Sequence, residues 1–270
     1  MSKIGNAIHE IHYMDSIAER DQWVNRIHPL VKFLLTIIYI ATVVSFYKYD
    51  VIGLAGMAVY PIAMFILSEL SFADSLKRLR IVLPLVCCIG LFNPFFDRIP
   101  VEILGIRMNA GVISMITLIM KGIMTVLASY LLIATTTIEK LCYAFRLIHV
   151  PKILVTQIML TYRYVTVLLE EVNRITQAYS LRAPNQKGVH FKVWGSLTGQ
   201  LLLRSMDRAG VVYESMTLRG YNGEFKYIGE KIRWRWQDVL YLVLWLGLFF
   251  LFRNVPVIVV VGNFVGGLFV

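Results

Sequence analysis

The sequence has few charged residues and few cysteines. Only 16% of its 270 residues are Asp, Glu, Lys or Arg, whereas 57% are hydrophobic, and the mean hydropathy is +0.65. This composition excludes an ordinary soluble domain and is typical of an integral membrane protein. The cysteines form no CxxC motif and no disulfide framework, and we interpret them as small hydrophobic residues: Cys87, Cys88 and Cys142.

The chain also lacks the motifs of common enzyme classes. It contains no glycine-rich phosphate loop with its Lys, no HExxH, no GxSxG and no paired carboxylates on an apolar helix. We therefore expect a chain that binds no ATP, holds no cofactor and is not an enzyme. His9 and His12 have the spacing of two metal ligands on a helix, but no further ligand clusters with them in the sequence. Residues 1–28 accordingly predict a polar cytoplasmic arm, without a metal site and without the apolar core of a signal peptide.

Long apolar stretches predict an all-α integral membrane protein with about five transmembrane helices. The third stretch is short and is interrupted by Pro84 and Pro94, so it is expected to tilt, break or draw on flanking residues. The segment 255–270 is apolar but rich in glycine, and the sequence leaves open whether it crosses the membrane. The five expected spans cover about 29–47, 51–70, 81–96, 110–135 and 238–252.

Positive charge is concentrated between the fourth and fifth of these spans. Residues 138–238 contain 15 Lys and Arg but only 8 Asp and Glu. By the positive-inside rule this segment is predicted to be cytoplasmic, and the four preceding spans then make the N-terminus cytoplasmic as well. We therefore divide the chain into an N-terminal arm, transmembrane helices 1–4, a cytoplasmic domain of amphipathic helices, and a final transmembrane helix with an apolar tail, at residues 1–28, 29–137, 138–235 and 236–270.

A long helix is expected in the first part of the cytoplasmic domain. Thr136 and Glu139 have the spacing of a capping box, so a helix is predicted to begin there. Pro151 ends that helix and opens another, which is expected to run to about Ala183. Its first half is apolar, but Gln157 and Arg163 would be costly at mid-bilayer. We therefore expect this half to pack along the membrane interface and the protein's own spans.

Two amphipathic helices of this domain end in similar sequences. The second helix has apolar residues on one face, and Arg204, Arg208 and Glu214 lie largely off it: the face consists of Leu202, Met206, Ala209, Tyr213 and Met216. Taken singly, such an end is an ordinary helix cap. Both helices, however, end in hydroxyl-Leu-Arg-small, with the arginines 37 positions apart: Ser180, Leu181, Arg182, Ala183 and Thr217, Leu218, Arg219, Gly220.

With these paired ends the chain resembles the transmembrane T component of energy-coupling-factor transporters, in the cobalt-type (CbiQ-like) branch. In that family two Ala-Arg-Gly-like ends cap the coupling helices and dock into two ATPase subunits. The resemblance implies that residues 138–235 form a coupling domain and that the eight residues of the two ends contact the ATPases. It also covers Ile17-Ala18-Glu19-Arg20, His28-Pro29-Leu30-Val31-Lys32 and Asn93-Pro94-Phe95-Phe96-Asp97-Arg98.

The resemblance further implies a role and a set of partners. The chain would be the membrane coupling subunit of an ATP-driven importer in the cell (inner) membrane, for cobalt or alternatively nickel or another micronutrient. Its partners would be two ATP-binding ATPase subunits, a separate substrate-binding membrane subunit and the lipid bilayer, with no nucleic acid. The basic residues alone would also fit nucleic acid or anionic lipid, but paired arginine ends favour a protein. The alternative is a stand-alone membrane enzyme or scaffold whose cytoplasmic helices bind another protein.

Lys121 is the main charged residue inside an expected span. An intramembrane lysine is a candidate functional residue, and no carboxylate lies in the same span to pair with it. Two roles remain open: a structural one, in which the ammonium group binds backbone carbonyls or reaches a cavity, and direct contact with substrate.

Overall fold

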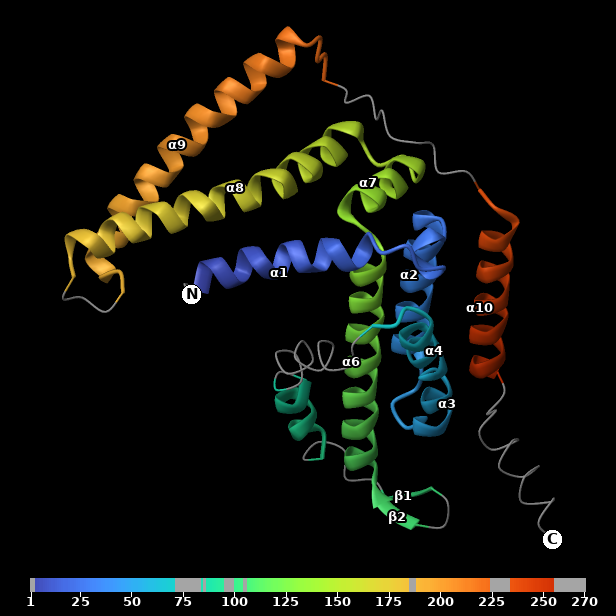
Figure 1. Cartoon of the computed structure of the whole chain (residues 1–270). Helices are drawn as coiled ribbons and strands as arrows, with labels where there is room; N and C mark the ends of the chain where they lie inside the picture. Colours follow the sequence, from blue (N-terminus) through green and yellow to red (C-terminus); the bar gives the residue numbers. More distant parts are fainter. Residues whose placement is uncertain are drawn as a thin grey trace. The chain divides into compact units, whose positions relative to one another are not determined.

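The computed structural model describes residues 3–70, 84, 86–94, 100–103, 106–184, 188–223 and 234–254, and almost all of them are helical (Figure 1). This confirms an all-α integral membrane protein. One short antiparallel hairpin, β1–β2, was not expected. The elements are α1 (Lys3–Ala18), η1 (Val24–Arg26), α2 (Pro29–Ser45), α3 (Val51–Gly56), α4 (Val59–Leu67), a helical segment over 86–94, β1 (Pro100–Ile103), β2 (Ile106–Asn109), α6 (Ala110–Thr135), α7 (Ile138–Leu147), α8 (Lys152–Arg182), α9 (Phe191–Leu218) and α10 (Trp236–Asn254).

The chain forms two compact units. One unit contains residues 1–17 and 137–231, and therefore α7, α8 and α9 with most of α1. The other contains residues 18–136 and 232–270, and therefore α2 to α6 and α10. The separation of the sequence into cytoplasmic and transmembrane regions remains a prediction, because the units are defined by contacts within the chain and not by a membrane.

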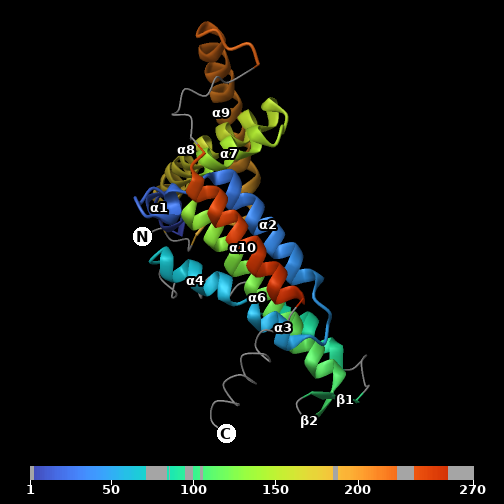
Figure 2. The ribbon, with the colours of Figure 1, turned by 90° about the vertical axis from the view of Figure 1, so that its right-hand side faces the viewer.

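The second unit is built around α2, which packs against α6 and α10 (Figures 1 and 2). Aromatic side chains fill the space between α2, α4 and α10. The ring of Tyr39 lies 4.6 Å from that of Tyr60, and the ring of Tyr60 lies 4.8 Å from Trp245 and 5.3 Å from Phe249. Such tilted and edge-on pairs add about 0.5–1.5 kcal/mol each beyond the burial of their area.

The second expected span is interrupted. Instead of one helix over 51–70, the structure has α3 and α4, separated by a turn at Met57 and Ala58. Pro61 explains this difference, because it has no N–H to donate to the carbonyl of Met57 four residues earlier. That carbonyl accepts from the hydroxyl of Tyr39, at 3.0 Å, and from the backbone N–H of Tyr60, at 3.3 Å. Pro61 is therefore the sequence signal for this interruption, which hydropathy alone does not reveal.

Length and hydropathy make α6, α8 and α10 candidates for crossing a membrane, and α2 and the segment Val51–Leu67 are shorter apolar helices. The 26 residues of α6 extend about 39 Å at ~1.5 Å per residue, more than the ~30 Å hydrocarbon core. Bulky apolar side chains also remain exposed on α2, α4 and α10, as expected for surfaces that face lipid. By length and hydropathy α8 could also cross a membrane. That its first half packs along the membrane interface therefore remains a prediction, which rests on the cost of placing Gln157 and Arg163 at mid-bilayer.

Two lysines link α2 and α6, and each one binds the C-terminal end of the other helix. Lys32, in the first turn of α2, is buried and donates to the carbonyl of Thr135 at the end of α6, at 2.8 Å. Lys121 of α6 donates to the carbonyls of Val44 and Phe46 at the end of α2, at 3.0 and 2.6 Å. Each lysine therefore binds final carbonyls that a helix cannot satisfy by itself, at the negative end of the helix dipole.

A buried carboxylate joins the starts of α2 and α10. Asp238 accepts from the backbone N–H of His28, at 3.0 Å, and from that of Arg235, at 2.9 Å. Its side chain therefore satisfies donors at two helix N-termini, where the helix dipoles favour a negative charge. His28 is buried and stacks on Trp234, and Leu30 N–H donates to its Nδ1. Burial lowers the pKa of His28, and the negative charge of Asp238 opposes that shift in part.

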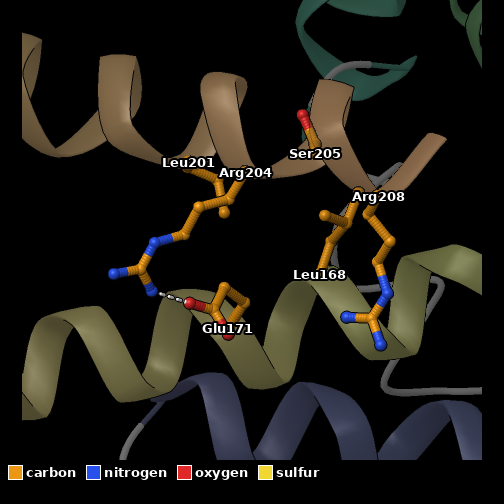
Figure 3. A pocket seen from close by; sticks show the side chains of 6 residues that line it. All are labelled: Leu168, Glu171, Leu201, Arg204, Ser205 and Arg208. Carbon is orange, nitrogen blue, oxygen red and sulfur yellow. Dashed lines mark hydrogen bonds and ion pairs between the residues drawn. The ribbon is translucent and has the colours of Figure 1, made fainter. Parts of the chain in front are cut away.

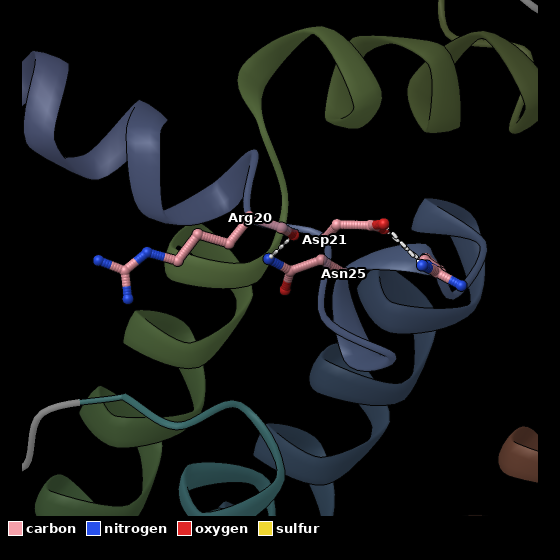
Figure 4. A network of polar contacts seen from close by, with 4 residues as sticks. Arg20, Asp21 and Asn25 are labelled. Carbon is pink, nitrogen blue, oxygen red and sulfur yellow. Dashed lines mark hydrogen bonds and ion pairs between the residues drawn. The ribbon is translucent and has the colours of Figure 1, made fainter.

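The turn before α2 is held by side chains close in sequence (Figure 4). Asn25 is buried and donates to the carbonyl of Arg20 at 2.9 Å. Arg26 forms a two-point ion pair with Asp21, with both distances 2.6 Å. Both partners of this pair are largely exposed, so we attribute the order of the turn mainly to Asn25.

We expect Asp238→Asn to lower the free energy of unfolding by about 2 kcal/mol, because one acceptor oxygen becomes a donor facing a backbone N–H. The measurement is denaturant unfolding of the purified protein in detergent micelles. Asp207→Asn is the matched control, since Asp207 is exposed on α9 and the variant loses the same charge. Equal stability of the two variants would contradict the structural role of Asp238.

Candidate functional site

In the unit that carries the two arginine-bearing ends, the segment 137–231 begins with α7. A helix begins here as expected, but its N-cap is one residue later than the expected capping box of Thr136 and Glu139, because the side chain of Thr137 accepts from the backbone N–H of Lys140 at 3.3 Å. The chain reverses through His149, which has a left-handed φ of 64°, and α8 then begins directly after Pro151, also as expected. The hydroxyl of Tyr162 on α8 donates to Asp15 on α1 at 2.6 Å.

Helices α8 and α9 form an antiparallel hairpin (Figure 1). Ile175 and Leu197 line one cavity between them, whereas Ile153 and Met216 line another. The end of α8 therefore lies beside the start of α9, and the start of α8 lies beside the end of α9. The C-terminal ends of the two helices consequently lie at opposite ends of the hairpin.

The end of α9 is a Schellman motif. Gly220 N–H donates to the carbonyl of Thr217 at 2.9 Å, and Tyr221 N–H donates to that of Met216 at 3.0 Å. Gly220 has a φ of 84°, a conformation that costs glycine little and other residues more. This is the left-handed cap that the sequence predicts, and it holds Arg219 at the last position before the chain turns.

The end of α8 is less constrained. Arg182 is its last helical residue, and Ala183 follows with a φ of −130°, outside the left-handed region. A single cap bond is formed, from Ala183 N–H to the carbonyl of Tyr179 at 3.1 Å. The two ends are therefore alike in sequence but differ in backbone geometry, and the difference follows from alanine in place of glycine.

Both ends present an exposed leucine beside an exposed arginine. Leu181 is 83% exposed and Leu218 is 89% exposed. Neither Arg182 nor Arg219 forms an ion pair within the described residues. The two hydroxyl residues match as well, since Ser180 donates to the carbonyl of Gln177 and Thr217 to that of Glu214. The two arginines can therefore engage a partner without first breaking an ion pair within the described chain.

The two arginines are far apart. Because α9 has 28 residues, the ends are separated by roughly its length, about 42 Å at ~1.5 Å per residue. One compact partner domain of ordinary size is about 30 Å across, so a single such domain would not cover both ends. The geometry instead fits two separate contacts.

An ion pair that the sequence analysis missed connects the helices of the hairpin. Arg204 of α9 donates to the carboxylate of Glu171 on α8, and Figure 3 shows the two side chains meeting between the helices. The side chain of Glu171 is only 18% exposed. The two residues are 33 positions apart, so their pairing could be found only once the register of the hairpin was known.

The apolar face expected on α9 needs a correction. Ala209, Tyr213 and Met216 line the cavity against α8, as expected. Leu202 and Met206 do not line that cavity and are 60% and 63% exposed. Arg208, which was placed off the apolar face, lies at the cavity instead. The face of α9 that meets α8 follows one stripe displaced by one position from the expected face, because its lining residues directly precede the expected ones: Leu201, Ser205, Arg208 and Val212.

The other candidate residues do not belong to these helix ends. Lys121 lies in the other unit and binds two carbonyls of the α2 terminus, as described above. His9 and His12 lie on α1, and the described part of the chain contains no group of three or more His, Cys, Asp or Glu side chains that could hold a metal ion.

Comparison with known proteins points to one family. Residues 20–228 match the family model CbiQ, described as a cobalt transport protein. The chain is 25% identical over 246 residues to the energy-coupling factor transporter transmembrane protein EcfT of Listeria innocua, covering 83% of this chain and 90% of the relative. It is 28% identical over 102 residues to the nickel permease LarQ of Lactiplantibacillus plantarum, covering 37% of each chain.

A further relative is an uncharacterized protein of Methanocaldococcus jannaschii, 27% identical over 173 residues, covering 60% of this chain and 59% of the relative. The match thus spans less than two thirds of this relative and of LarQ, but nearly the whole of EcfT. The family model extends from the turn before α2 to beyond the end of α9 and so includes both arginine-bearing ends. The chain therefore belongs to the CbiQ family of cobalt transport proteins.

Proposed function

We propose that this chain is the transmembrane T component of an energy-coupling-factor importer. It does not hydrolyse ATP itself, and it transmits the motion of two ATPase subunits to a separate substrate-binding membrane subunit. The observation that carries this proposal is the pair of exposed Leu-Arg helix ends, which lie at opposite ends of one hairpin and form no ion pair within the described residues.

The chemistry of each end fits a protein groove that contains a carboxylate. A guanidinium group can donate two parallel hydrogen bonds to a carboxylate, which fixes direction as well as distance. The neighbouring Leu181 or Leu218 can enter an apolar pocket beside it. Burying such a leucine contributes about 1.5–3 kcal/mol, and the arginine supplies orientation.

A coupling role also fits the connection between the helices. Only Thr136 and Thr137 separate the end of α6 from the start of α7, so α7 continues from a candidate transmembrane helix with almost no linker. Short connections between helices transmit displacement, whereas long flexible linkers absorb it. Movement of a partner bound at α8 or α9 would therefore reach the spans.

The transported substrate in this proposal is cobalt, with nickel or another micronutrient as the alternatives. The family description favours cobalt, and the relative LarQ is a nickel permease. The substrate-binding subunit would select the ion. The orientation in the cell membrane, with both the N-terminus and α7–α9 in the cytoplasm, rests on the excess of Lys and Arg over residues 138–238.

We expect Arg182→Ala and Arg219→Ala each to weaken ATPase binding by about 2–5 kcal/mol, because each strands a buried carboxylate on the partner. The double variant should abolish uptake. Arg→Lys should rescue only in part, since the two-point geometry is lost. We expect Arg219 to be the more sensitive position, because Gly220 holds its direction. The measurements are ATPase pull-down and metal uptake at matched expression.

The control for these variants is Arg174→Ala, which removes an exposed arginine of α8 away from its end. It should bind both ATPases and transport like the parent. If both alanine variants at the helix ends behave like this control, the arginines serve only as helix caps. A partner other than an ATPase in the pull-down would instead support a scaffold.

We expect Lys121→Met to assemble normally and to reduce uptake only in part, because Lys121 binds carbonyls of the chain itself. The variant should lower the free energy of unfolding by about 1–3 kcal/mol, since two carbonyls lose a charged donor. Metal uptake and denaturant unfolding are measured in parallel. Complete loss of uptake with normal assembly and stability would place Lys121 on the transport path.

We expect a single cysteine at position 222, introduced by Asn222→Cys in a background without the native cysteines, to resist an impermeant thiol reagent applied to whole cells. Residue 222 lies four positions after the end of α9, in the segment predicted to be cytoplasmic. Lys48→Cys, in the turn predicted to lie outside, is the matched control and should react. Reaction at position 222 without permeabilisation would reverse the proposed orientation.

A further inference from the structure

The hairpin of α8 and α9 contains an open groove beside the Glu171–Arg204 ion pair. Its volume is about 560 Å³, within the ~300–1,000 Å³ typical of small-molecule sites. On one side of the ion pair the helices enclose a smaller apolar cavity of about 160 Å³, and on the other side they diverge. The groove walls are mainly apolar and come from both helices, including Ile153, Leu160, Leu168, Ala209, Val212 and Met216.

The positively charged side chain of Arg208 lies at the narrow end of this groove. Arg208 lines both the groove and a separate cavity of about 290 Å³ at the Glu171–Arg204 ion pair, and in Figure 3 its guanidinium group extends toward α8. Arg204 neutralises Glu171. Arg208, by contrast, forms no ion pair within the described part of the chain. A cation at one end of an apolar groove complements an amphiphile with an anionic head group.

The length, hydropathy and exposure of α8 favour a membrane lipid as this amphiphile. This helix is long and apolar enough to cross a membrane, yet little of its apolar stretch is buried inside the protein. Ile153 and Leu154 are 71% and 54% exposed. From Leu168 to Ile153 the groove follows 15 residue steps of α8, about 22 Å at ~1.5 Å per step. One acyl chain spans half of the ~30 Å hydrocarbon core, about 15 Å, and so fits within this length.

We propose that the groove binds one acyl chain of an anionic phospholipid from the surrounding membrane, whose phosphate is bound by Arg208. The acyl chain fills the space in which α8 and α9 diverge, while the Glu171–Arg204 ion pair holds the helices together at the narrow end. The lipid thereby supports the open angle of the hairpin. This inference does not depend on the role of Arg182 and Arg219, because the groove lies between the helices and not at those ends.

The test is native mass spectrometry of the full-length protein with phosphatidylglycerol or phosphatidylcholine. The parent should retain one phosphatidylglycerol and bind phosphatidylcholine about tenfold more weakly. Arg208→Gln should weaken phosphatidylglycerol binding by about tenfold and leave phosphatidylcholine binding unchanged, because only the charge-assisted bond is lost. Val212→Trp, which fills the groove, should weaken both. Arg163→Gln, an exposed arginine of α8 outside the groove, is the matched control and should bind like the parent.

Three results would overturn the proposal. The first is equal retention of phosphatidylglycerol by the parent and by Arg208→Gln. The second is unchanged lipid binding in Val212→Trp with normal helix content by circular dichroism. The third is a photo-crosslink from position 212 of the assembled complex to a partner polypeptide instead of to lipid, which would make the groove a protein interface.

Discussion

Helix ends inside or near a membrane impose the constraint on which this structure depends. Backbone carbonyls at the end of a helix have no intrahelical donor, and hydrocarbon offers none. In the described chain, Lys32 and Lys121 supply donors across the α2–α6 pair, each to the C-terminal end of the other helix. Asp238 supplies the corresponding acceptor at the N-terminal ends of α2 and α10. These contacts fix the antiparallel alignment of α2 with α6 and the start of α10, and the aromatic residues pack between α2, α4 and α10.

The same property of helix ends explains the candidate docking site. A helix that ends in water can leave its last side chains free for a partner, provided that its backbone is capped locally. At the end of α9 the Schellman motif of Gly220 caps the backbone without using Arg219. At the end of α8 a single backbone bond to Tyr179 does so without using Arg182. Both arginines therefore remain available, although the chain is held more firmly after α9 than after α8.

Much of the local structure could be predicted from the sequence. Pro29, Thr137 and Pro151 mark helix starts, Gly220 marks a helix end, and the apolar stretch 110–135 coincides with α6. These signals act within a few residues, so they do not depend on the rest of the fold. The apolar span expected over about 51–70 is present, but its helix is interrupted between α3 and α4, a break that Pro61 signals in the sequence. The β1–β2 hairpin was missed because it lies between spans and has no hydropathy signal.

The sequence by itself determined the class of protein, the positions of most helices and the paired Leu-Arg ends, because composition, periodicity and capping residues are local properties. The tertiary structure alone decided which charges meet. Lys121 could have bound substrate or carbonyls, and only the packing of α6 against α2 brought it to Val44 and Phe46. The register of α8 against α9 likewise paired Glu171 with Arg204 and left Arg208 at the groove. Contacts between residues distant in sequence depend on how helices pack, which no local pattern specifies.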